Sequence, residues 1–202
     1  MNKVHYLPWI GKDYPAGGIF SQKILVLGES HYTDEEKGSD FTRNVVSDYL
    51  NPEKRDSWMP TFLKFERSLV GHVADQKERA AIWNSVAFYN YLQETVSGPR
   101  EKGRREMYEQ SKAPFFQVLN ELRPDMMIVW GYRLWNNLPG EKWQDGQDIY
   151  IDDYKVLQGA YILEDGTPVK VVCVYHPAAG YSWDYWHRVI KSVMELDSAQ
   201  RI

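Results

Sequence analysis

Residues 23–32, Lys-Ile-Leu-Val-Leu-Gly-Glu-Ser-His-Tyr, pass directly from a run of apolar side chains to a run of polar ones. A short, almost wholly apolar run is typical of a strand in a parallel sheet, because helices cover both faces of such a sheet. A second run of this kind, Val-Lys-Val-Val-Cys-Val-Tyr at residues 169–175, leads into His176-Pro177. Ligands of α/β sheets bind outside the carboxyl ends of the strands. We therefore expect the polar residues that follow both strands to meet in one crevice.

Two further apolar runs lie between these strands, at residues 85–89 and 126–130. We expect the first to be a strand that ends at Asn90 and the second a strand that ends at Trp130-Gly131. For residues 85–89 a helix is an alternative, because Trp83, Val86 and Tyr89 also fit a 3.6-residue period.

Helical patterns alternate with the four strands. They cover residues 61–72, a short stretch before Ile82, residues 111–124 with Ser111 as N-cap, residues 132–138, and a C-terminal helix that carries Trp183, Trp186, Ile190 and Val193. Residues 149–163 alternate in polarity and Asp165-Gly166 marks a turn, which predicts an antiparallel hairpin with the last strand. This order predicts an α/β fold, a three-layer α/β/α sandwich with a short, mostly parallel central sheet and a small hairpin elaboration.

The length of 202 residues predicts a single α/β domain over residues 1–202. Within it, residues 1–22 are expected to be an irregular N-terminal arm because they are rich in Pro and Gly. Residues 33–60 are expected to be a long polar connection, and residues 94–110 a charged, exposed segment.

The charge and the apolar content exclude some classes of partner. A net charge of −4 does not suit a protein held on nucleic acid by bulk charge, and the basic run at 99–105 is diluted by acidic neighbours. Because the chain has a single cysteine, Cys173, an intramolecular disulfide is excluded. Cys173 lies in an apolar strand. No stretch is apolar over the length of a membrane span or signal peptide. We therefore expect a cytoplasmic setting and no membrane partner. The oligomeric state is left open.

The polar residues at the strand ends each have a plausible chemical use. Asn90 offers a donor and an acceptor with which to read the edge of an amide-like ring, and Tyr32 can stack on that ring. His176 can donate to an oxygen that gains negative charge as a bond breaks. Glu29 can position a water molecule or stabilise a cationic sugar.

The order of these motifs resembles that of the uracil-DNA glycosylase superfamily. The first family motif follows strand one and reads Gly-Gln-Asp-Pro-Tyr or Gly-Glu-Ala/Gly-Pro-Gly, where this chain has Gly28-Glu29-Ser30-His31-Tyr32. An Asn ends the second family strand, which Asn90 resembles, with Asn84 as the alternative. Trp130-Gly131 resembles the end of the third strand. His176-Pro177-Ala178 resembles the last motif, His-Pro-Ser, and the likeness extends over about residues 20–195.

This resemblance implies hydrolysis of the N-glycosidic bond of a base flipped out of DNA, with no cofactor and no metal. Glu29 and His176 would be the catalytic residues. The substrate-binding residues would be Gly28, Ser30, His31, Tyr32, Asn90 and Pro177. The loop that enters DNA would carry Tyr181 and Tyr185. DNA, or another ligand that contains a nucleobase, is therefore the expected partner.

Three residues depart from the family pattern. Ser30 stands where one branch has its water-activating Asp, His31 replaces a Pro, and Ala178 replaces a Ser that helps to grip the DNA backbone. The loss of the Asp leaves open a non-catalytic module that binds a nucleobase or nucleic acid. A metal-dependent hydrolase that uses Glu29, His31 and His176 is a further alternative, since two His and one carboxylate can hold zinc.

Overall fold

The computed structural model describes residues 1–98, 101–178 and 180–195, and its centre is a seven-stranded mixed sheet in the order β1-β3-β2-β4-β9-β8-β5. Four adjacent strands are parallel: β3 (Val86–Asn90), β2 (Ile24–Gly28), β4 (Met126–Trp130) and β9 (Pro168–Val174). The strands β1 (Trp9–Ile10), β8 (Gln158–Ile162) and β5 (Trp143–Asp145) pair antiparallel with their neighbours. A separate small hairpin consists of β6 (Tyr150–Ile151) and β7 (Tyr154–Lys155).

All four strands expected from the sequence are confirmed. The helical alternative for residues 85–89 is wrong, because Val86–Asn90 pairs in register with Ile24–Gly28. The hairpin before the last strand is also confirmed, with Ile162 opposite Pro168. The protein is therefore of mixed α/β class with a largely parallel sheet centre.

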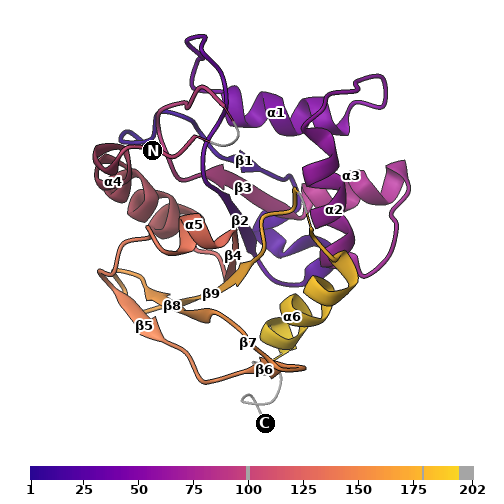
Figure 1. The fold of residues 1–202 in the computed structure, drawn as a ribbon, viewed down its shortest axis with the longest axis vertical. Coiled ribbons are helices and arrows are strands. Elements are labelled where there is room, and N and C mark those ends of the chain that lie inside the picture. The colour runs from indigo at the N-terminus through magenta and orange to yellow at the C-terminus, as the bar shows by residue number, and fades with distance from the viewer. Residues whose placement is uncertain (99–100, 179, 196–202) are drawn as a thin grey trace.

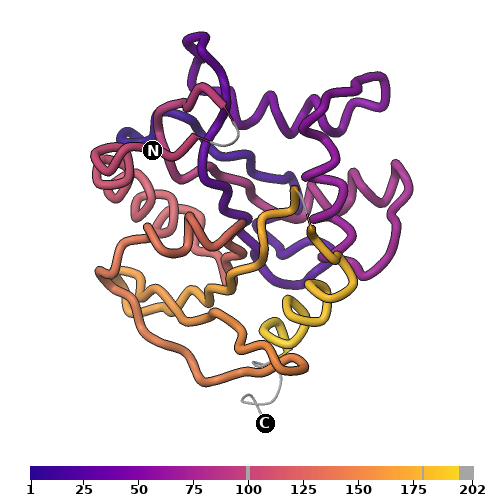
Figure 2. The backbone as a smooth tube through the Cα atoms, in the orientation of Figure 1, coloured from indigo at the N-terminus to yellow at the C-terminus, as the bar shows by residue number. Residues whose placement is uncertain are grey.

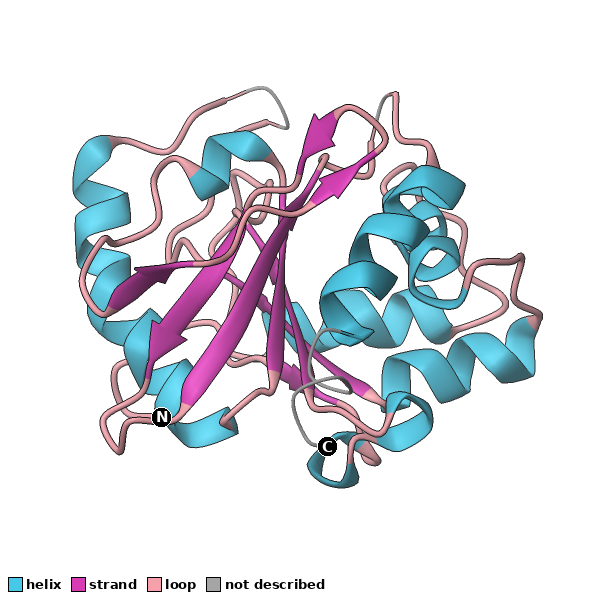
Figure 3. Cartoon of the chain, turned by 90° about the horizontal axis from the view of Figure 1, so that it is seen from below, coloured by secondary structure: helices cyan, strands magenta, loops and turns pink. Residues whose placement is uncertain are grey.

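Helices pack on both sides of this sheet (Figure 3). They are α1 (Phe41–Leu50), α2 (Met59–Val70), α3 (Gln76–Asn84), α4 (Arg105–Leu122), α5 (Tyr132–Trp135) and α6 (Trp183–Glu195). Alternate side chains of β2 pack into the cores on opposite sides of the sheet. Ile24 and Val26 join one core with residues of α2 and α6, whereas Leu25 and Leu27 join the other with residues of α4. In Figure 1, α4 lies to the left of the central strands, and α2 and α6 lie to the right. This division explains why β2 is apolar at every position.

Three expectations about segments outside the strands need correction. Residues 111–124 are only part of a helix that begins at Arg105, and Ser111 is not its cap but an interior residue whose hydroxyl donates to the carbonyl of Met107. Residues 105–110 of the expected exposed segment are therefore helical, and Met107 and Tyr108 are buried, whereas the other four residues are exposed as expected. The connection at 33–60 contains α1. The arm at 1–22, the indigo start of the tube in Figure 2, contains two short 3-10 helices and β1. The strand β1 pairs with β3.

The strand order reverses at the centre of the sheet. After β2 the chain forms β3 on one side of it and then returns to form β4 on the other. Such a reversal leaves a crevice outside the carboxyl ends of the two strands, which is where α/β proteins bind ligands. The residues that follow β2 and β4 are therefore the first to consider as a site. No helix in the described part of the chain is long and apolar enough to cross a membrane.

Candidate functional site

Glu29 is the first residue after β2 and lies at the point where the strand order reverses. Its side chain is only 5% exposed and binds Arg133 of α5, with the Arg133 Nη2 2.5 Å from Glu29 Oε2 and the Nε 2.7 Å from the same oxygen. The Arg133 Nε is also 2.9 Å from Oε1, and Tyr108 of α4 donates its hydroxyl hydrogen to Oε1. Both carboxylate oxygens therefore already accept hydrogen bonds from the protein.

The contacts of Glu29 also affect its partners. Hydrogen bonding to Glu29 raises the pKa of the Arg133 guanidinium, so this group stays charged. Burial raises the pKa of the Tyr108 phenol, and the hydrogen bond to Glu29 raises it further. Tyr108 therefore remains a neutral donor. The three side chains form an ion pair with one additional donor.

His31 lies two residues further along the chain and is buried. Its Nδ1 lies 3.2 Å from the Asn90 Nδ2, which donates to it, so the His31 Nε2–H donates to the Thr42 hydroxyl oxygen at 2.8 Å. Burial lowers the pKa of His31 to about 4. The imidazole is therefore neutral at pH 7 with both ring nitrogens engaged, and its role is to hold Asn90.

Asn90 ends β3 directly beside Gly28, its partner in the parallel register. A Cβ atom at residue 28 would lie 2.1 Å from the Asn90 Oδ1, so only glycine lets the amide lie against the end of β2. The alternative base reader, Asn84, ends α3 before β3 begins, and its amide donates to the carbonyl of Ala80. Asn84 is therefore at the wrong end of the strand to face this crevice.

His176 follows β9 and is half-buried. The end of β4 approaches it closely, since a Cβ atom on Gly131 (φ +95°) would lie 3.2 Å from the His176 Cβ. Burial lowers the pKa of His176, the charge of Arg133 lowers it further, and that of Glu29 opposes both. The ring makes no hydrogen bond to any residue that the structure describes. Among the described residues His176 is thus a neutral donor or acceptor without a hydrogen-bond partner, and it is near enough to Glu29 and Arg133 for both charges to affect its pKa.

The backbone just after His176 is anchored to α2. Pro177 is buried, and Lys64 of α2 donates to the carbonyl oxygen of Ala178. Residue 179, within the expected DNA-contact loop, lies outside the described residues, as do residues 99 and 100 of the basic run. The link from α2 fixes the start of this loop relative to the core.

Tyr32 and Ser30 complete the first motif. The Tyr32 side chain is 39% exposed, and the adjacent backbone is anchored by the Thr33 N–H to the carbonyl of Val96. Burial of its phenol raises the pKa of Tyr32, and so does the charge of Glu29. Ser30 is buried. Tyr32 therefore lies near the ion pair with part of its ring open to solvent, as a stacking residue requires.

Tyr181 and Tyr185 do not lie as a DNA-contact loop requires. Tyr181 is buried, its hydroxyl oxygen is 2.8 Å from the Ser68 hydroxyl, and its ring stacks on Trp186 with centroids 6.1 Å apart. Tyr185 is half-buried, and its ring packs edge-on against Trp186. Both rings therefore pack against Trp186 of α6, and Tyr181, which precedes this helix, is also fixed by its contact with Ser68 of α2.

Tyr108, Arg133 and Thr42 are site residues that the sequence interpretation did not select. Arg133 stands just beyond the third strand, which was the available signal for it. Tyr108 lies three residues before Ser111 and seven before Phe115, so a longer reading of that apolar helix face would have included it. Thr42 lies in α1, which the sequence analysis did not anticipate.

The residues named for a metal site are not arranged as metal ligands. Both nitrogens of His31 and both oxygens of Glu29 are engaged by protein groups. Within the described residues, no group of three or more His, Cys, Asp or Glu side chains is placed to hold a metal ion.

The chain matches no protein-family model, and no curated protein is similar enough to count as a relative. We therefore infer function from the geometry of the site.

Proposed function

We propose that this protein is a divergent member of the uracil-DNA glycosylase superfamily, a three-layer α/β/α protein that hydrolyses the N-glycosidic bond of a flipped base. The observation that carries the proposal is the position of His176, unpartnered among the described residues and close to Glu29 and Arg133 where the strand order reverses. This is the usual ligand position in an open α/β sheet. We further propose a cytoplasmic location, in keeping with the lone buried thiol of Cys173.

His176 and Arg133 would act on the base. In the reaction that the resemblance implies, negative charge develops on the base as the bond to the sugar breaks. A neutral imidazole N–H can donate to the base oxygen, as donors in oxyanion sites do. The Arg133 Nη1 makes no hydrogen bond to any described residue and lies on a side chain that is 31% exposed. Arg133 can therefore add a second, charged donor.

Glu29 and Asn90 would complete the site. Because both oxygens of Glu29 accept hydrogen bonds, Glu29 would hold Arg133 and stabilise a cationic sugar by its charge, rather than remove a proton from water. Asn90, held by His31, would read the base edge, and the half-exposed Tyr32 would stack on the ring. Flipping the base would cost a few kcal/mol in lost stacking.

One observation favours a second function, that of a non-catalytic module which binds a nucleobase or nucleic acid. In this structure neither Ser30 nor the occupied carboxylate of Glu29 can serve as a strong base. Such a module would bind the same ligand in the same crevice without cleaving it.

Release of uracil from single-stranded and duplex oligonucleotides tests both functions. Abasic sites would be detected by alkaline strand cleavage, and binding by fluorescence anisotropy. We expect His176→Ala to reduce release by about a hundredfold, the effect of losing one oxyanion donor. His72→Ala, which changes an exposed histidine two residues beyond the end of α2, serves as the matched control. Binding without release of any modified base would identify the module. Neither binding nor release would refute both proposals.

A further inference from the structure

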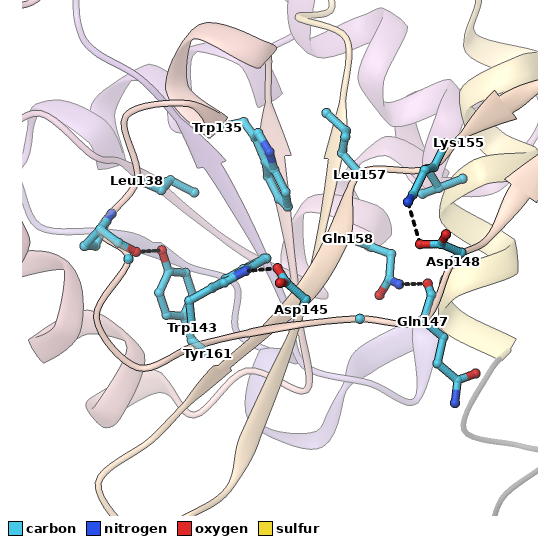
Figure 4. A pocket seen from close by; sticks show the side chains of 14 residues that line it. Trp135, Leu138, Trp143, Asp145, Gln147, Asp148, Lys155, Leu157, Gln158 and Tyr161 are labelled. Carbon is cyan, nitrogen blue, oxygen red and sulfur yellow. Dashed lines mark hydrogen bonds and ion pairs between the residues drawn. The ribbon is translucent and has the colours of Figure 1, made fainter.

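A pocket lies beyond α5 and over β5 and β8, apart from the residues of the candidate site. Its volume is about 530 Å³, which is within the usual range for a site that takes a small organic molecule. Its lining includes Trp135, Trp143, Asp145 and Gln158, and Figure 4 shows these side chains turned toward one hollow. None of the residues proposed for the base-hydrolysing site lines this pocket.

Two indole rings form walls of the pocket. The centroids of Trp135 and Trp143 are 5.2 Å apart and their planes meet at 87°. Trp143 lies on β8 because Gly159 has no side chain there: a Cβ atom at residue 159 would be 2.3 Å from the Trp143 Cζ2. Gly146 in the same way lets the amide of Gln158 approach, since a Cβ atom there would be 2.1 Å from its Oε1. The two glycines thus allow both polar and aromatic groups to reach the hollow.

The hydrogen bonds within the lining engage the Trp143 indole N–H and the Gln158 amide nitrogen, and they leave two acceptor oxygens open. The Trp143 Nε1–H donates to the Asp145 Oδ1 at 2.8 Å, and the Gln158 Nε2 donates to the carbonyl of Gln147. The Lys155 ammonium is paired with Asp148 at 2.6 Å. The Asp145 Oδ2 and the Gln158 Oε1 have no hydrogen-bond partner among the described residues. A ligand that suits this pocket therefore donates hydrogen bonds.

We propose that this pocket binds a planar group with an edge of paired N–H donors, such as an amidinium, a guanidinium or the Watson–Crick edge of guanine. A flat delocalised group can lie against an indole face, where a positive charge is also attracted. A carboxylate accepts two parallel N–H bonds from such an edge, and the Gln158 oxygen can accept a further one. The formal charges of Asp145, Asp148 and Lys155 leave one negative charge in the lining, which favours the cationic forms. This inference goes beyond the proposed hydrolysis and does not depend on it.

Benzamidine and benzamide are the probes for this pocket, because they have nearly the same shape but only benzamidine has the charged, doubly donating edge. Each would be titrated into ¹⁵N-labelled protein, with the indole N–H signals of the eight tryptophans observed by NMR and those of Trp135 and Trp143 assigned from Phe variants. We expect benzamidine to shift these two signals and to bind at least ten times more tightly than benzamide, since a hydrogen bond to a charged group is worth about that factor. Equal binding of the two probes, or shifts only at other tryptophans, would overturn the proposal.

Two carboxylate variants give the matched comparison. Asp145→Asn should weaken benzamidine binding about tenfold, whereas Asp148→Asn should weaken it less than twofold, because Asp148 is already paired with Lys155 and both side chains are more than half exposed. Equal effects of the two variants would contradict the role of Asp145. If Asp145→Asn does not fold, Trp135→Leu removes an indole wall instead and should weaken the binding of both probes; unchanged binding of both would refute the placement of the ligand in this pocket.

Two further probes distinguish between the kinds of biological ligand that could supply such an edge of N–H donors. Agmatine carries a guanidinium on an aliphatic chain, and guanosine carries a neutral amidine-type edge on a flat ring. Tighter binding of agmatine identifies a guanidinium ligand, and tighter binding of guanosine identifies a purine. Failure of both to displace benzamidine would show that the pocket does not recognise this edge in a biological ligand and would overturn the proposal.

Discussion

Replacing His31 by Gln should remove a specific part of the dependence of stability on pH. The His31 ring is 6% exposed, and burial lowers its pKa to about 4 from an ordinary 6.5. Protonation would also place an N–H on Nδ1, opposite the Asn90 amide that now donates to it. The folded protein therefore resists a proton that the unfolded chain accepts readily.

The sign and size of the effect follow from these two pKa values. The unfolded state binds more protons between pH 6.5 and 4, so the stability that neutral His31 contributes is fully present above pH 6.5 and is lost as the pH falls. The two pKa values differ by about 2.5. Since one pKa unit corresponds to about 1.4 kcal/mol, this difference amounts to about 3.4 kcal/mol of stability in total. About 2 kcal/mol of this should be lost between pH 7 and pH 5.

Urea unfolding followed by circular dichroism at pH 7 and pH 5 measures this loss. The His31→Gln variant should lose about 2 kcal/mol less than the wild type over that interval, whatever its absolute stability. His5→Gln, which changes an exposed histidine, should lose as much as the wild type. If His31→Gln and the wild type lose the same free energy of unfolding, the burial argument for a neutral His31 is refuted.

Three further substitutions test contacts that hold the core and the site, each by urea unfolding at pH 7. Tyr108→Phe removes the donor to Glu29 and should lower the free energy of unfolding by about 1–3 kcal/mol; an unchanged value would mean that this bond does not help to hold the carboxylate. Glu66→Gln breaks an ion pair whose carboxylate is fully buried and should cost about 3 kcal/mol, and a loss below 1 kcal/mol would contradict that. Gly28→Ala should cost about 1–3 kcal/mol because its Cβ would meet an asparagine amide, whereas Gly38→Ala, in open space, is its control; equal losses would argue against the close approach.

The strands were predictable because burial on both faces leaves a plain signal. Residues 24–28 and 126–130 are buried at every position, and such runs of apolar residues bounded by polar ones allow few other structures. Elements that are half exposed were harder to place. The helix α1 has a weak apolar face, and β1 is two residues long and is stabilised by pairing with β3 rather than by its own sequence.

The start of α4 shows why the local signal misled. Ser111 is a good N-cap type and Pro114 follows it closely, which together favour a helix that begins there. In the structure the helix begins at Arg105, because Met107 and Tyr108 extend the buried face toward the N-terminus. Tertiary packing outweighed the capping preference, and the same packing delivers the Tyr108 hydroxyl to Glu29.

For the site, the strand ends could be located from the sequence, but the side chains that donate hydrogen bonds to Glu29 could not. Residues at the ends of adjacent parallel strands must be neighbours, so the proximity of Gly28 and Asn90 follows from topology alone. Whether a carboxylate is free or paired depends on a long side chain from another element. Arg133 is 104 residues away in sequence, and no periodicity links it to Glu29.

The two buried carboxylates, Glu29 and Glu66, differ in a way that favours the proposed ligand role for the pair of Glu29 and Arg133. A buried ion pair is costly to desolvate, and apolar residues of similar volume often stabilise as well, so stability alone does not explain either pair. The Glu66–Arg79 pair is closed: Tyr49 and a Trp indole also donate to Glu66, and the Arg79 Nη1 donates to a Gln side chain. The Arg133 Nη1, in contrast, has no partner among the described residues and points from an ion pair that lies at the reversal of the strand order. An open donor at the usual ligand position is what a binding site needs, and it is the feature that separates Glu29 from a carboxylate that only holds helices together.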